Sequence, residues 1–488
     1  MVAVVAVLVG VIGAGRPSFW FDEAATITAS TRSTSELLEL VSEHDSAHSL
    51  YYLLMHSWFS VFPHTEFWSR VPSVLAIGVA AAGVVVLGRR LSTRAVGLTS
   101  GLLFAILPRV TWAAVEARPY ALSAAVAVWL VVALLVAVDR RTVARWAVYA
   151  ALLVFAILVS IHMLLLVVVL LCILVAVHPP RSAILGWLAA TAVALVVLLP
   201  YVQFMRSKAD QINWIRPLDK SVFWTFLQAQ YFDTALWFLG AGIALTAGTA
   251  LTLWFRTPAI DGFWRVALVS AAWIIVPTAG MLLYSVFVKV IYVDRYLTFT
   301  APAMALMLGA FAVQVAAHSI IRIDVVVLIF GLVALPNYID QRSDYAKFGA
   351  DYSQIADVIA AQSSPGDCFL LDETAVWRPR PIRSLPASRP EAFEDLVDVG
   401  LYERATEDNI LWDRNLRADR VIDRIDKCQT LWTITGKNRI FPDHEQEPAL
   451  APGQRFGASP AYLIPAGLGF RLVERWQFNV GQVVKSVR

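Results

Sequence analysis

Eleven apolar stretches, separated by short polar segments, occupy the first two thirds of the chain. They fall near residues 2–15, 70–88, 95–108, 120–137, 146–161, 163–177, 184–202, 236–255, 266–287, 297–317 and 323–336. A straight helix needs about 20 apolar residues to cross the hydrocarbon core of a bilayer. The pattern predicts an α-helical polytopic membrane protein with about 11 transmembrane helices. Because no basic residue precedes the short first stretch, we expect a start upstream of Met1 or a partly sunken helix rather than a cleaved signal peptide.

The pattern changes near residue 337, where short polar and apolar segments replace the long stretches. Residues 352–361 have helical periodicity, and the turn residues 364–367 precede a strand-like segment at 368–371. A second strand-like segment covers 430–435. This alternation predicts a membrane domain of residues 1–336 followed by a small α/β domain of residues 337–488.

Composition agrees with a membrane protein and limits its partners. Apolar residues make up 58% of the chain and charged residues 16%, against about 45–50% and 25% in soluble domains. The formal net charge of +3 is too small to indicate nucleic-acid binding. The sequence also has no Gly-rich loop of the kind that cradles nucleotide phosphates.

Basic residues orient the predicted helices. Alternate loops carry them: Arg89, Arg90, Arg94, Arg140, Arg141, Arg145, Arg181, Arg256, Arg265 and Arg322. By the positive-inside rule these loops are cytoplasmic, so the other loops and the domain of residues 337–488 are expected on the extracytoplasmic face of the cell membrane. Cys368 and Cys428 then lie in an oxidising compartment and could form a disulfide, although their spacing does not show proximity.

Asp22 and Glu23 follow the first apolar stretch, flanked by aromatic residues at 19–21. Charged groups beside hydrocarbon are costly, so this pair calls for a reason. One reading is acid–base chemistry on a lipid-linked substrate at the membrane surface. The other is a solvated pair of acids that caps a short helix.

The rest of the first extracytoplasmic loop is rich in histidine and aromatic residues. Ser33 and Glu36 form a capping-box pattern that predicts an amphipathic helix along the membrane surface. His44, Asp45 and His48 come next and could bind a divalent metal. The alternative, which we favour, is that they form hydrogen bonds in a polar pocket near the two acids, with Tyr51 available for stacking.

Three arginines stand in extracytoplasmic loops, against the basic bias: Arg118, Arg216 and Arg295. A guanidinium offers a planar set of donors that fits a phosphate, although an arginine at a helix end can also reach the interface or pair with a nearby acid. Candidate substrate contacts lie close by in the sequence or at a predicted helix break: Glu116, Tyr120, His162, Trp214 and Tyr296.

Six short motifs resemble a known enzyme class. They are Phe-Trp-Phe-Asp-Glu-Ala at 19–24, His-Asp-Ser-Ala-His-Ser-Leu-Tyr-Tyr-Leu-Leu at 44–54, Arg-Val-Pro-Ser-Val at 70–74, Gly-Arg-Arg at 88–90, Glu-Ala-Arg-Pro-Tyr at 116–120 and Arg-Tyr at 295–296. In this order they resemble the GT-C membrane glycosyltransferases, in the branch of protein O-mannosyltransferases and aminoarabinose transferases, including actinobacterial cell-envelope mannosyltransferases. The resemblance covers residues 1 to about 336. It departs after Asp45, where relatives often have His-Pro-Pro and this chain has His-Ser-Leu.

The resemblance implies an inverting glycosyltransferase that moves a sugar, with mannose favoured, from a polyprenyl-phosphate donor. The acceptor would be a hydroxyl of a cell-envelope glycolipid, polysaccharide or protein. Asp22 aligns with the family's catalytic base, Glu23 would tune it, and Arg118, Arg216 and Arg295 would hold the donor phosphate. No cofactor is expected unless His44, Asp45 and His48 bind a metal. The alternative function is a lipid-linked saccharide transporter or a non-catalytic binding protein, which would need no loop carboxylate.

Overall fold

The computed structural model describes residues 1–379 and 381–488, and the chain forms two compact units. We call them the helical unit and the mixed unit. The helical unit consists of Met1–Ala14, Asp45–Tyr51 and Arg70–Gln341. The mixed unit consists of Gly15–His44, Tyr52–Ser69 and Arg342–Arg488. Each unit is therefore built from three separate segments of the chain.

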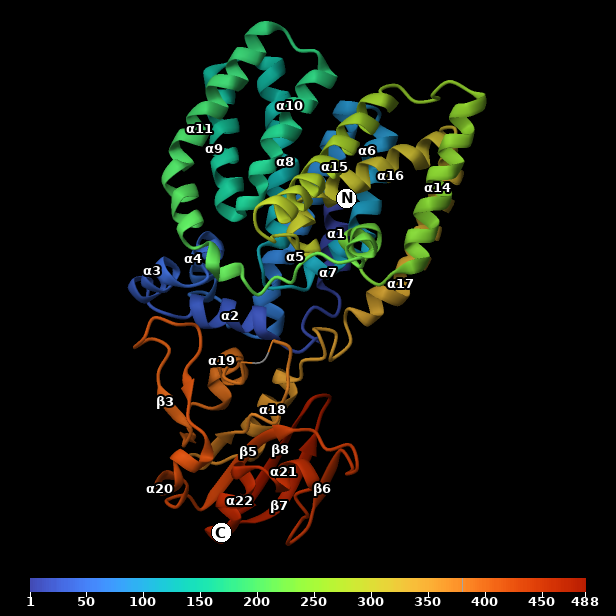
Figure 1. Cartoon of the computed structure of the whole chain (residues 1–488). Helices are drawn as coiled ribbons and strands as arrows, with labels where there is room; N and C mark the ends of the chain where they lie inside the picture. The colour runs from blue at the N-terminus through green and yellow to red at the C-terminus, as the bar shows by residue number, and fades with distance from the viewer. Residues whose placement is uncertain (380) are drawn as a thin grey trace. The chain divides into compact units, whose positions relative to one another are not determined.

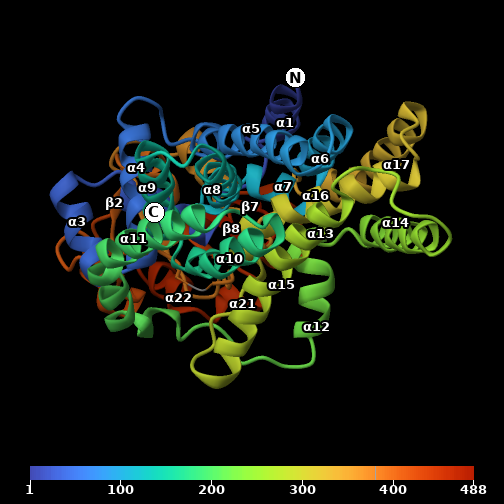
Figure 2. The same ribbon diagram turned by 90° about the horizontal axis from the view of Figure 1, so that it is seen from above.

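The helical unit is formed by helices of very different lengths (Figure 1). Its longer helices are α1 (Val2–Val11), α5 (Glu66–Leu91, which begins in the mixed unit), α6 (Arg94–Ile106), α7 (Pro108–Ala114), α8 (Tyr120–Arg140), α9 (Val143–Val159), α10 (Leu166–Val177), α11 (Arg181–Ser207), α14 (Leu236–Phe255), α15 (Phe263–Phe287), α16 (Ala301–Val315) and α17 (Ile320–Asp340). Its short elements are η1 (Ser46–His48), η2 (Ile161–Leu165), η3 (Ala209–Ile212), α12 (Val222–Trp224), η4 (Thr225–Ala229), α13 (Gln230–Phe232) and η5 (Asp294–Thr300). The helix α4 (Ser49–Phe59) begins in this unit and continues into the mixed unit. Seen in both views, α9 and α11 lie on one side of the unit, whereas α14 and α17 lie together on the other (Figures 1 and 2).

The apolar helices confirm the predicted class of a multi-pass membrane protein. Among the described residues, seven helices are long and apolar enough to cross a membrane, and the bent pair α6 and α7 would add an eighth as one broken span. The apolar segments Val2–Val11, Val143–Val159 and Ile161–Val177 are shorter than these. Each of the eleven apolar stretches in the sequence falls on one of these helices or helix pairs.

A proline explains the bend between α6 and α7. The sequence pattern treated 95–108 as one continuous stretch, but α6 ends at Ile106 and α7 begins at Pro108, with an angle of 60° between them. Proline disfavours the helical conformation of the residue before it, and Leu107 is extended, with φ −64° and ψ 126°. Pro108 is then tolerated as the first residue of a new helix.

Small residues let the central helices of this unit pack closely. A Cβ atom added to Gly309 in α16 would lie 2.1 Å from the hydroxyl oxygen of Ser100 in α6. A Cβ atom on Gly97 in α6 would lie 2.5 Å from the carbonyl oxygen of Val85 in α5. Larger side chains would force these backbones apart, and close backbone approach is how helices associate in lipid.

The mixed unit contains a six-stranded sheet and short helices. Its strands are β1 (Cys368–Leu371), β2 (Val397–Asp398), β3 (Leu401–Glu403), β4 (Arg414–Asn415), β5 (Thr430–Gly436), β6 (His444–Gln446), β7 (Arg471–Gln477) and β8 (Gly481–Val487). Its helices are α2 (Phe21–Ser30), α3 (Thr34–Glu43), α18 (Tyr352–Gln362), α19 (Ser384–Ser388), η6 (Pro390–Ala392), η7 (Ala418–Arg420), α20 (Ile422–Ile425), α21 (Gln454–Gly457) and α22 (Pro460–Gly467).

The large sheet has the order β2-β1-β5-β8-β7-β6, and β3 pairs with β4 in a separate ribbon. β1 runs parallel to β2 and β5, whereas the remaining pairs of the large sheet are antiparallel. All four residues of β1 are buried because helices cover both faces of the sheet. Phe369 faces a core shared with α18, and Leu370 faces a core shared with α20, α21 and α22.

The helix that carries the two acids belongs to the mixed unit. Phe19, Trp20 and Ile27 are buried in the same core as Tyr352 and Trp432. The backbone N–H of Phe19 donates to the hydroxyl of Ser353 at 3.0 Å, and the Trp20 ring lies 4.5 Å from that of Phe348. The chain around Asp22 is therefore held by contacts with residues of the C-terminal segment.

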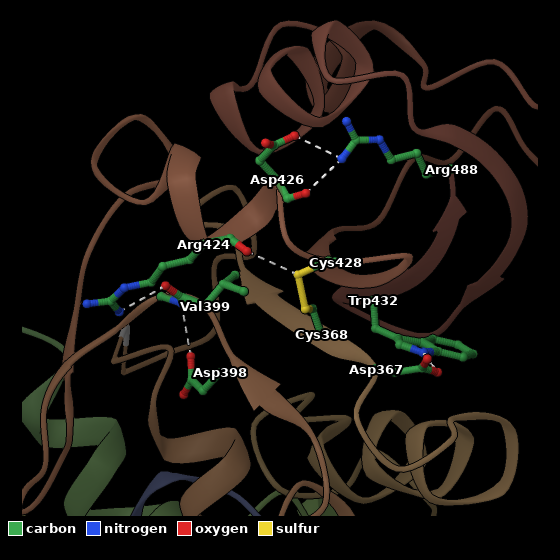
Figure 3. Close-up of a disulfide and its surroundings, with 10 residues drawn as sticks. Asp367, Cys368, Asp398, Val399, Arg424, Asp426, Cys428, Trp432 and Arg488 are labelled. Atoms are coloured by element: carbon green, nitrogen blue, oxygen red, sulfur yellow. Dashed lines mark hydrogen bonds and ion pairs between the residues drawn. A yellow bond between two sulfur atoms is a disulfide. The ribbon is translucent and has the colours of Figure 1, made fainter.

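Cys368 and Cys428 form a disulfide at one end of the sheet (Figure 3). Their Cα atoms are 6.0 Å apart, and both residues are buried. The bond connects the first residue of β1 to the turn that precedes β5. Next to it, the indole N–H of Trp432 donates to a carboxylate oxygen of Asp367 at 2.9 Å (Figure 3). The disulfide thus connects two positions that are 60 residues apart in the sequence.

Candidate functional site

Aromatic rings surround Arg295 in the helical unit. Its Nε donates to the hydroxyl oxygen of Tyr120 at 3.1 Å, and its guanidinium carbon lies 5.7 Å from the ring centre of Trp214. The ring of Tyr296 stacks on the imidazole of His162 with centres 4.9 Å apart. These contacts bring together η5, the start of α8, the turn η2 and the segment after η3. Four residues singled out by their sequence context therefore gather around one arginine.

A second arginine, Arg118, lies at the start of the turn before α8 and is buried. Its guanidinium is 3.8 Å from Asp45 Oδ2, and Oδ1 of the same carboxylate is 3.8 Å from His48 Nε2. Asp45 has a left-handed conformation, with φ 49°, which aspartate tolerates better than most residues. This turn directs the chain into η1, so that Asp45 and His48 are close enough to interact.

Burial and neighbouring charges both act on the imidazole of His48. Burial lowers the pKa of His48 to about 3, and the positive charges of Arg118 and Arg295 act in the same direction against the opposing effect of Asp45. The imidazole is therefore neutral at physiological pH, so one ring nitrogen donates a hydrogen bond and the other accepts one. Because the pKa of His48 is so low, its imidazole is a weak general base. The positive charges of Arg118 and Arg295 favour an anionic ligand near it.

Neighbouring residues fix both halves of this cluster. The amide of Gln211 accepts a hydrogen bond from the backbone N–H of Ser46 at 3.2 Å, which ties η1 to η3. Buried Arg109 in α7 forms an ion pair with Asp294, the residue before Arg295. Arg109 was missed in the sequence because it follows the apolar stretch 95–108. The signal was present, since an arginine beside an apolar span needs a partner.

The other predicted contacts divide into two groups. Glu116 is buried, and its backbone carbonyl accepts a hydrogen bond from Ser73 at 2.6 Å. Tyr51 is buried at the start of α4. Arg216, by contrast, is exposed.

Asp22 and Glu23 lie in the first turn of α2, in the mixed unit. The positive end of the helix dipole favours negative side chains at this position. Glu23 is fully buried, whereas Asp22 is partly exposed. The predicted loop is therefore a helix. The predicted amphipathic helix after it is α3, and Ser33 and Glu36 form the capping box indicated by the sequence.

The candidate metal ligands His44, Asp45 and His48 do not form a metal-binding group in the part of the chain that the structure describes. No group of three or more His, Cys, Asp and Glu side chains is arranged to bind a metal ion within residues 1–379 and 381–488. His44 ends α3 and is exposed. Asp45 lies 3.8 Å from the guanidinium of Arg118 and 3.8 Å from the imidazole of His48, and a nearby guanidinium disfavours a bound cation.

Comparisons with known proteins place the fold. Neither protein-family models nor curated sequences give a match to this chain. Among solved structures, ArnT from Cupriavidus metallidurans bound to undecaprenyl phosphate aligns over 99% of this chain and 97% of its own, with a TM-score of 0.57 and 15% sequence identity. The fold is that of ArnT. The apo state of ArnT aligns over the same shares with a TM-score of 0.56 and 13% identity.

A third likeness is weaker. The oligosaccharyltransferase of Archaeoglobus fulgidus, solved in complex with zinc and sulfate, has a TM-score of 0.43 at 12% identity, over 89% of this chain and 68% of its own. That score is too low to carry an argument. The likeness to ArnT, which runs through both units of the chain, establishes a GT-C fold with a C-terminal domain that contains a sheet.

Proposed function

We propose that this chain is an inverting glycosyltransferase that takes a sugar from a polyprenyl-phosphate donor. The observation that carries the proposal is the cluster of Arg118, Arg295 and neutral His48 in a chain with the ArnT fold. The ArnT structure holds undecaprenyl phosphate, which is a polyprenyl monophosphate. Sequence motifs and fold, which are independent observations, point to the same class of enzyme.

The donor phosphate is assigned to Arg118 and Arg295. Arg295 donates a hydrogen bond to Tyr120, which follows Arg118 by two positions, so the two arginines belong to adjoining parts of the folded chain. The polyprenyl phosphate that leaves in the reaction already carries negative charge, and it gains more as its bond to the sugar breaks. Fixed cationic donors stabilise such a developing charge strongly in a site that excludes water. Arg216 is exposed and receives no part in this assignment.

Asp22 is assigned the role of general base. Its carboxylate would accept the proton of an acceptor hydroxyl while the hydroxyl oxygen bonds to the anomeric carbon of the sugar. The bond between that carbon and the phosphate oxygen breaks in the same step, and the electron pair leaves with the polyprenyl phosphate. The displacement inverts the anomeric centre. Glu23 is fully buried one position further along α2 and is assigned to orienting Asp22 or the acceptor.

The extracytoplasmic face is proposed for both the active site and the C-terminal domain. The distribution of arginines between alternate loops supports this orientation. The disulfide between Cys368 and Cys428 supports it as well, because such bonds persist in oxidising compartments. We propose that the transferred sugar is a hexose. Mannose is the first candidate, because the sequence motifs resemble those of cell-envelope mannosyltransferases. The acceptor is proposed to be a glycolipid, polysaccharide or protein of the cell envelope.

The test is a transfer assay with purified full-length protein and a panel of polyprenyl-phosphate sugars and envelope acceptors. Asp22→Asn should bind the donor as the wild type does and lose transfer by about 100-fold or more, the usual contribution of a general base. Glu39→Gln changes an exposed acid in α3 of the same unit and should retain transfer. Wild-type transfer rates in Asp22→Asn would overturn the role of Asp22, and lipid movement without transfer would favour a transporter.

A further inference from the structure

A polar cavity of about 390 Å³ lies within the mixed unit, formed only by residues of the C-terminal segment. Its volume falls in the range of small-ligand sites, about 300–1,000 Å³. It is lined by residues that follow β1, by the end of β4 with η7, and by the segment that joins α21 to α22: Leu371, Asp372, Glu373, Thr374, Asn415, Arg417, Ala418, Arg455, Ala458, Ser459, Pro460 and Ala461. None of these residues has a role in the proposed transfer reaction.

The position of the cavity in the sheet is favourable for binding. It lies at the carboxyl end of β1, which has parallel neighbours on both sides, β2 and β5. The chain leaves β1 to form β2 on one side and later forms β5 on the other side, so the strand order reverses here. Open α/β sheets bind ligands at such reversals, in the crevice beyond the carboxyl ends of the strands.

A network of hydroxyl groups holds Asp372 in the cavity wall. Asp372 is only 8% exposed. Its Oδ1 accepts a hydrogen bond from Ser459 at 2.9 Å, and its Oδ2 accepts bonds from Thr435 at 2.9 Å and from Thr374. A carboxylate has about four lone-pair positions, so these three donors leave Asp372 able to accept one more hydrogen bond.

A second buried group fixes Asn415, another residue of the lining. The guanidinium of Arg383, which is 3% exposed, donates to the side-chain oxygen of Asn415 at 2.7 and 3.0 Å. The same arginine forms an ion pair with Asp398. Because the oxygen of Asn415 is engaged, its orientation is set and its amide nitrogen is directed to act as a donor. The lining therefore holds one fixed hydrogen-bond acceptor, the carboxylate of Asp372, and one fixed donor, the amide nitrogen of Asn415.

The charges of the lining select the class of ligand. Arg417 and Arg455 contribute donors, whereas Asp372 and Glu373 contribute acceptors. A phosphate or carboxylate ligand would be attracted by the two arginines but repelled by the two acids, and an ammonium ligand would experience the reverse, so neither charge suits all four residues. Neutral hydroxyl groups donate to carboxylates and accept from guanidinium groups, so they suit both. The aliphatic surfaces of Ala458, Pro460 and Ala461 can pack against the C–H groups of a sugar ring.

We propose that this cavity is a carbohydrate-binding site that takes one or two units of a neutral oligosaccharide. The site is separate from the residues assigned to sugar transfer. Within a glycosyltransferase it would bind a saccharide of the cell envelope while the reaction takes place elsewhere. Binding, however, does not depend on transfer, so the site can be tested even if the proposed enzyme activity is wrong.

The experiment measures binding of neutral oligosaccharides to the full-length protein in lipid nanodiscs, with no donor present. Manno-, gluco-, galacto- and arabino-oligosaccharides would be offered at up to about 10 mM, a range suited to weak binding. We expect binding of at least one of them by saturation-transfer NMR and calorimetry. Arg455→Ala and Asn415→Ala should each weaken that binding by about tenfold, as expected for the loss of a hydrogen bond that involves a fixed or charged donor.

The matched control is Arg439→Ala, which removes an exposed arginine of the mixed unit that does not line the cavity. It should bind the oligosaccharide as the wild type does. Three outcomes would overturn the proposal. These are no binding of any oligosaccharide, equal loss of binding in Arg439→Ala and Arg455→Ala, and tighter binding of inorganic phosphate that competes with the sugar, which would make the cavity an anion site.

Discussion

Arg295 donates a hydrogen bond from its Nε to the hydroxyl oxygen of Tyr120, across 175 positions of sequence. The sequence places each residue in a separate motif, Glu-Ala-Arg-Pro-Tyr at 116–120 and Arg-Tyr at 295–296. The hydrogen bond uses Nε, the guanidinium nitrogen nearest the aliphatic part of the side chain, and does not involve the two terminal nitrogens, which are the ones that can bind a phosphate as a pair. The contact therefore orients the arginine without competing with the proposed ligand.

Tyr120→Phe tests this orientation. The variant removes one hydroxyl and keeps the ring, so the stacking with Tyr296 remains possible. A hydrogen bond to a charged group contributes about 1.5–3 kcal/mol, and we expect the affinity for a polyprenyl phosphate to fall by about tenfold or more. Tyr402→Phe alters an exposed tyrosine of the mixed unit and serves as the control. Equal donor affinities for Tyr120→Phe and the wild type would show that the tyrosine does not position Arg295.

The burial of His48 predicts a loss of stability in mild acid. Burial and the charge of Arg118 lower its pKa to about 3 from an ordinary value of 6.5. The unfolded chain binds a proton below pH 6.5 that the folded chain does not bind until about pH 3, so stability decreases as the pH falls through this interval. At pH 5 the loss from this residue is about 2 kcal/mol.

The measurement is the thermal unfolding temperature at pH 7.5 and at pH 5.0, in the same detergent. The wild type should lose stability between the two, and His48→Gln should lose less, because glutamine does not titrate. His318→Gln provides a control at an exposed histidine of the helical unit. Equal losses of stability in acid for His48→Gln and the wild type would show that protonation of His48 does not destabilise the folded protein.

Reduction of the disulfide should destabilise the mixed unit. The bond between Cys368 and Cys428 closes a loop of 60 residues, for which the chain-entropy model gives about 4 kcal/mol. We expect a reductant to lower the unfolding temperature of the wild type and to have little effect on the double variant Cys368→Ser, Cys428→Ser. Cys172→Ser, at the one free cysteine of the described residues, should respond to the reductant as the wild type does.

Arg389 pairs with three acids from two segments of the mixed unit, and its removal should weaken that unit. It forms ion pairs of 2.8 Å with Glu66, 3.0 Å with Asp357 and 2.8 Å with Glu391. Burial alone would lower the pKa of Arg389, but the charges of Glu66 and Asp357 raise it. Arg389→Gln leaves the poorly exposed carboxylate of Glu66 without this cation, at a cost of about 1–3 kcal/mol.

Chemical denaturation of the full-length protein, followed by tryptophan fluorescence, would measure the effect of Arg389→Gln. The exposed Arg439→Gln is the matched control and should unfold at the same denaturant concentration as the wild type. A shift of the same size in both variants would assign the effect to net charge. The ion-pair account requires a larger shift in Arg389→Gln.

Hydrophobic patterning was sufficient for some local elements of this fold. The stretch 236–255 coincides with α14, and the strand-like 368–371 coincides with β1. The helix α18 (Tyr352–Gln362) extends the predicted 352–361 by one residue. These elements are determined by local periodicity and turn residues, which are visible within a window of about 10–20 residues.

Long-range features could not be read in the same way. No local signal shows that Phe19 packs beside Tyr352, because the two residues share a core only in the folded chain. Arg118 and Arg295 are far apart in the sequence, and the hydrogen bond from Arg295 to Tyr120, two positions after Arg118, forms only in the folded chain. The exposed Arg216 had an equally suggestive sequence context, and its position depends on how the segment between η3 and α12 folds.

The mixed unit has a consequence for exchanging parts between related proteins. Residues Phe19, Trp20 and Ile27 fill a core that is otherwise made by the C-terminal segment. A chimera that replaced only Arg342–Arg488 would leave these side chains against a foreign surface. Gly15–His44 and Tyr52–Ser69 would have to be transplanted with it. The module that evolution or an engineer can exchange intact is therefore discontinuous in the gene, and it takes Asp22 and Glu23 along with it.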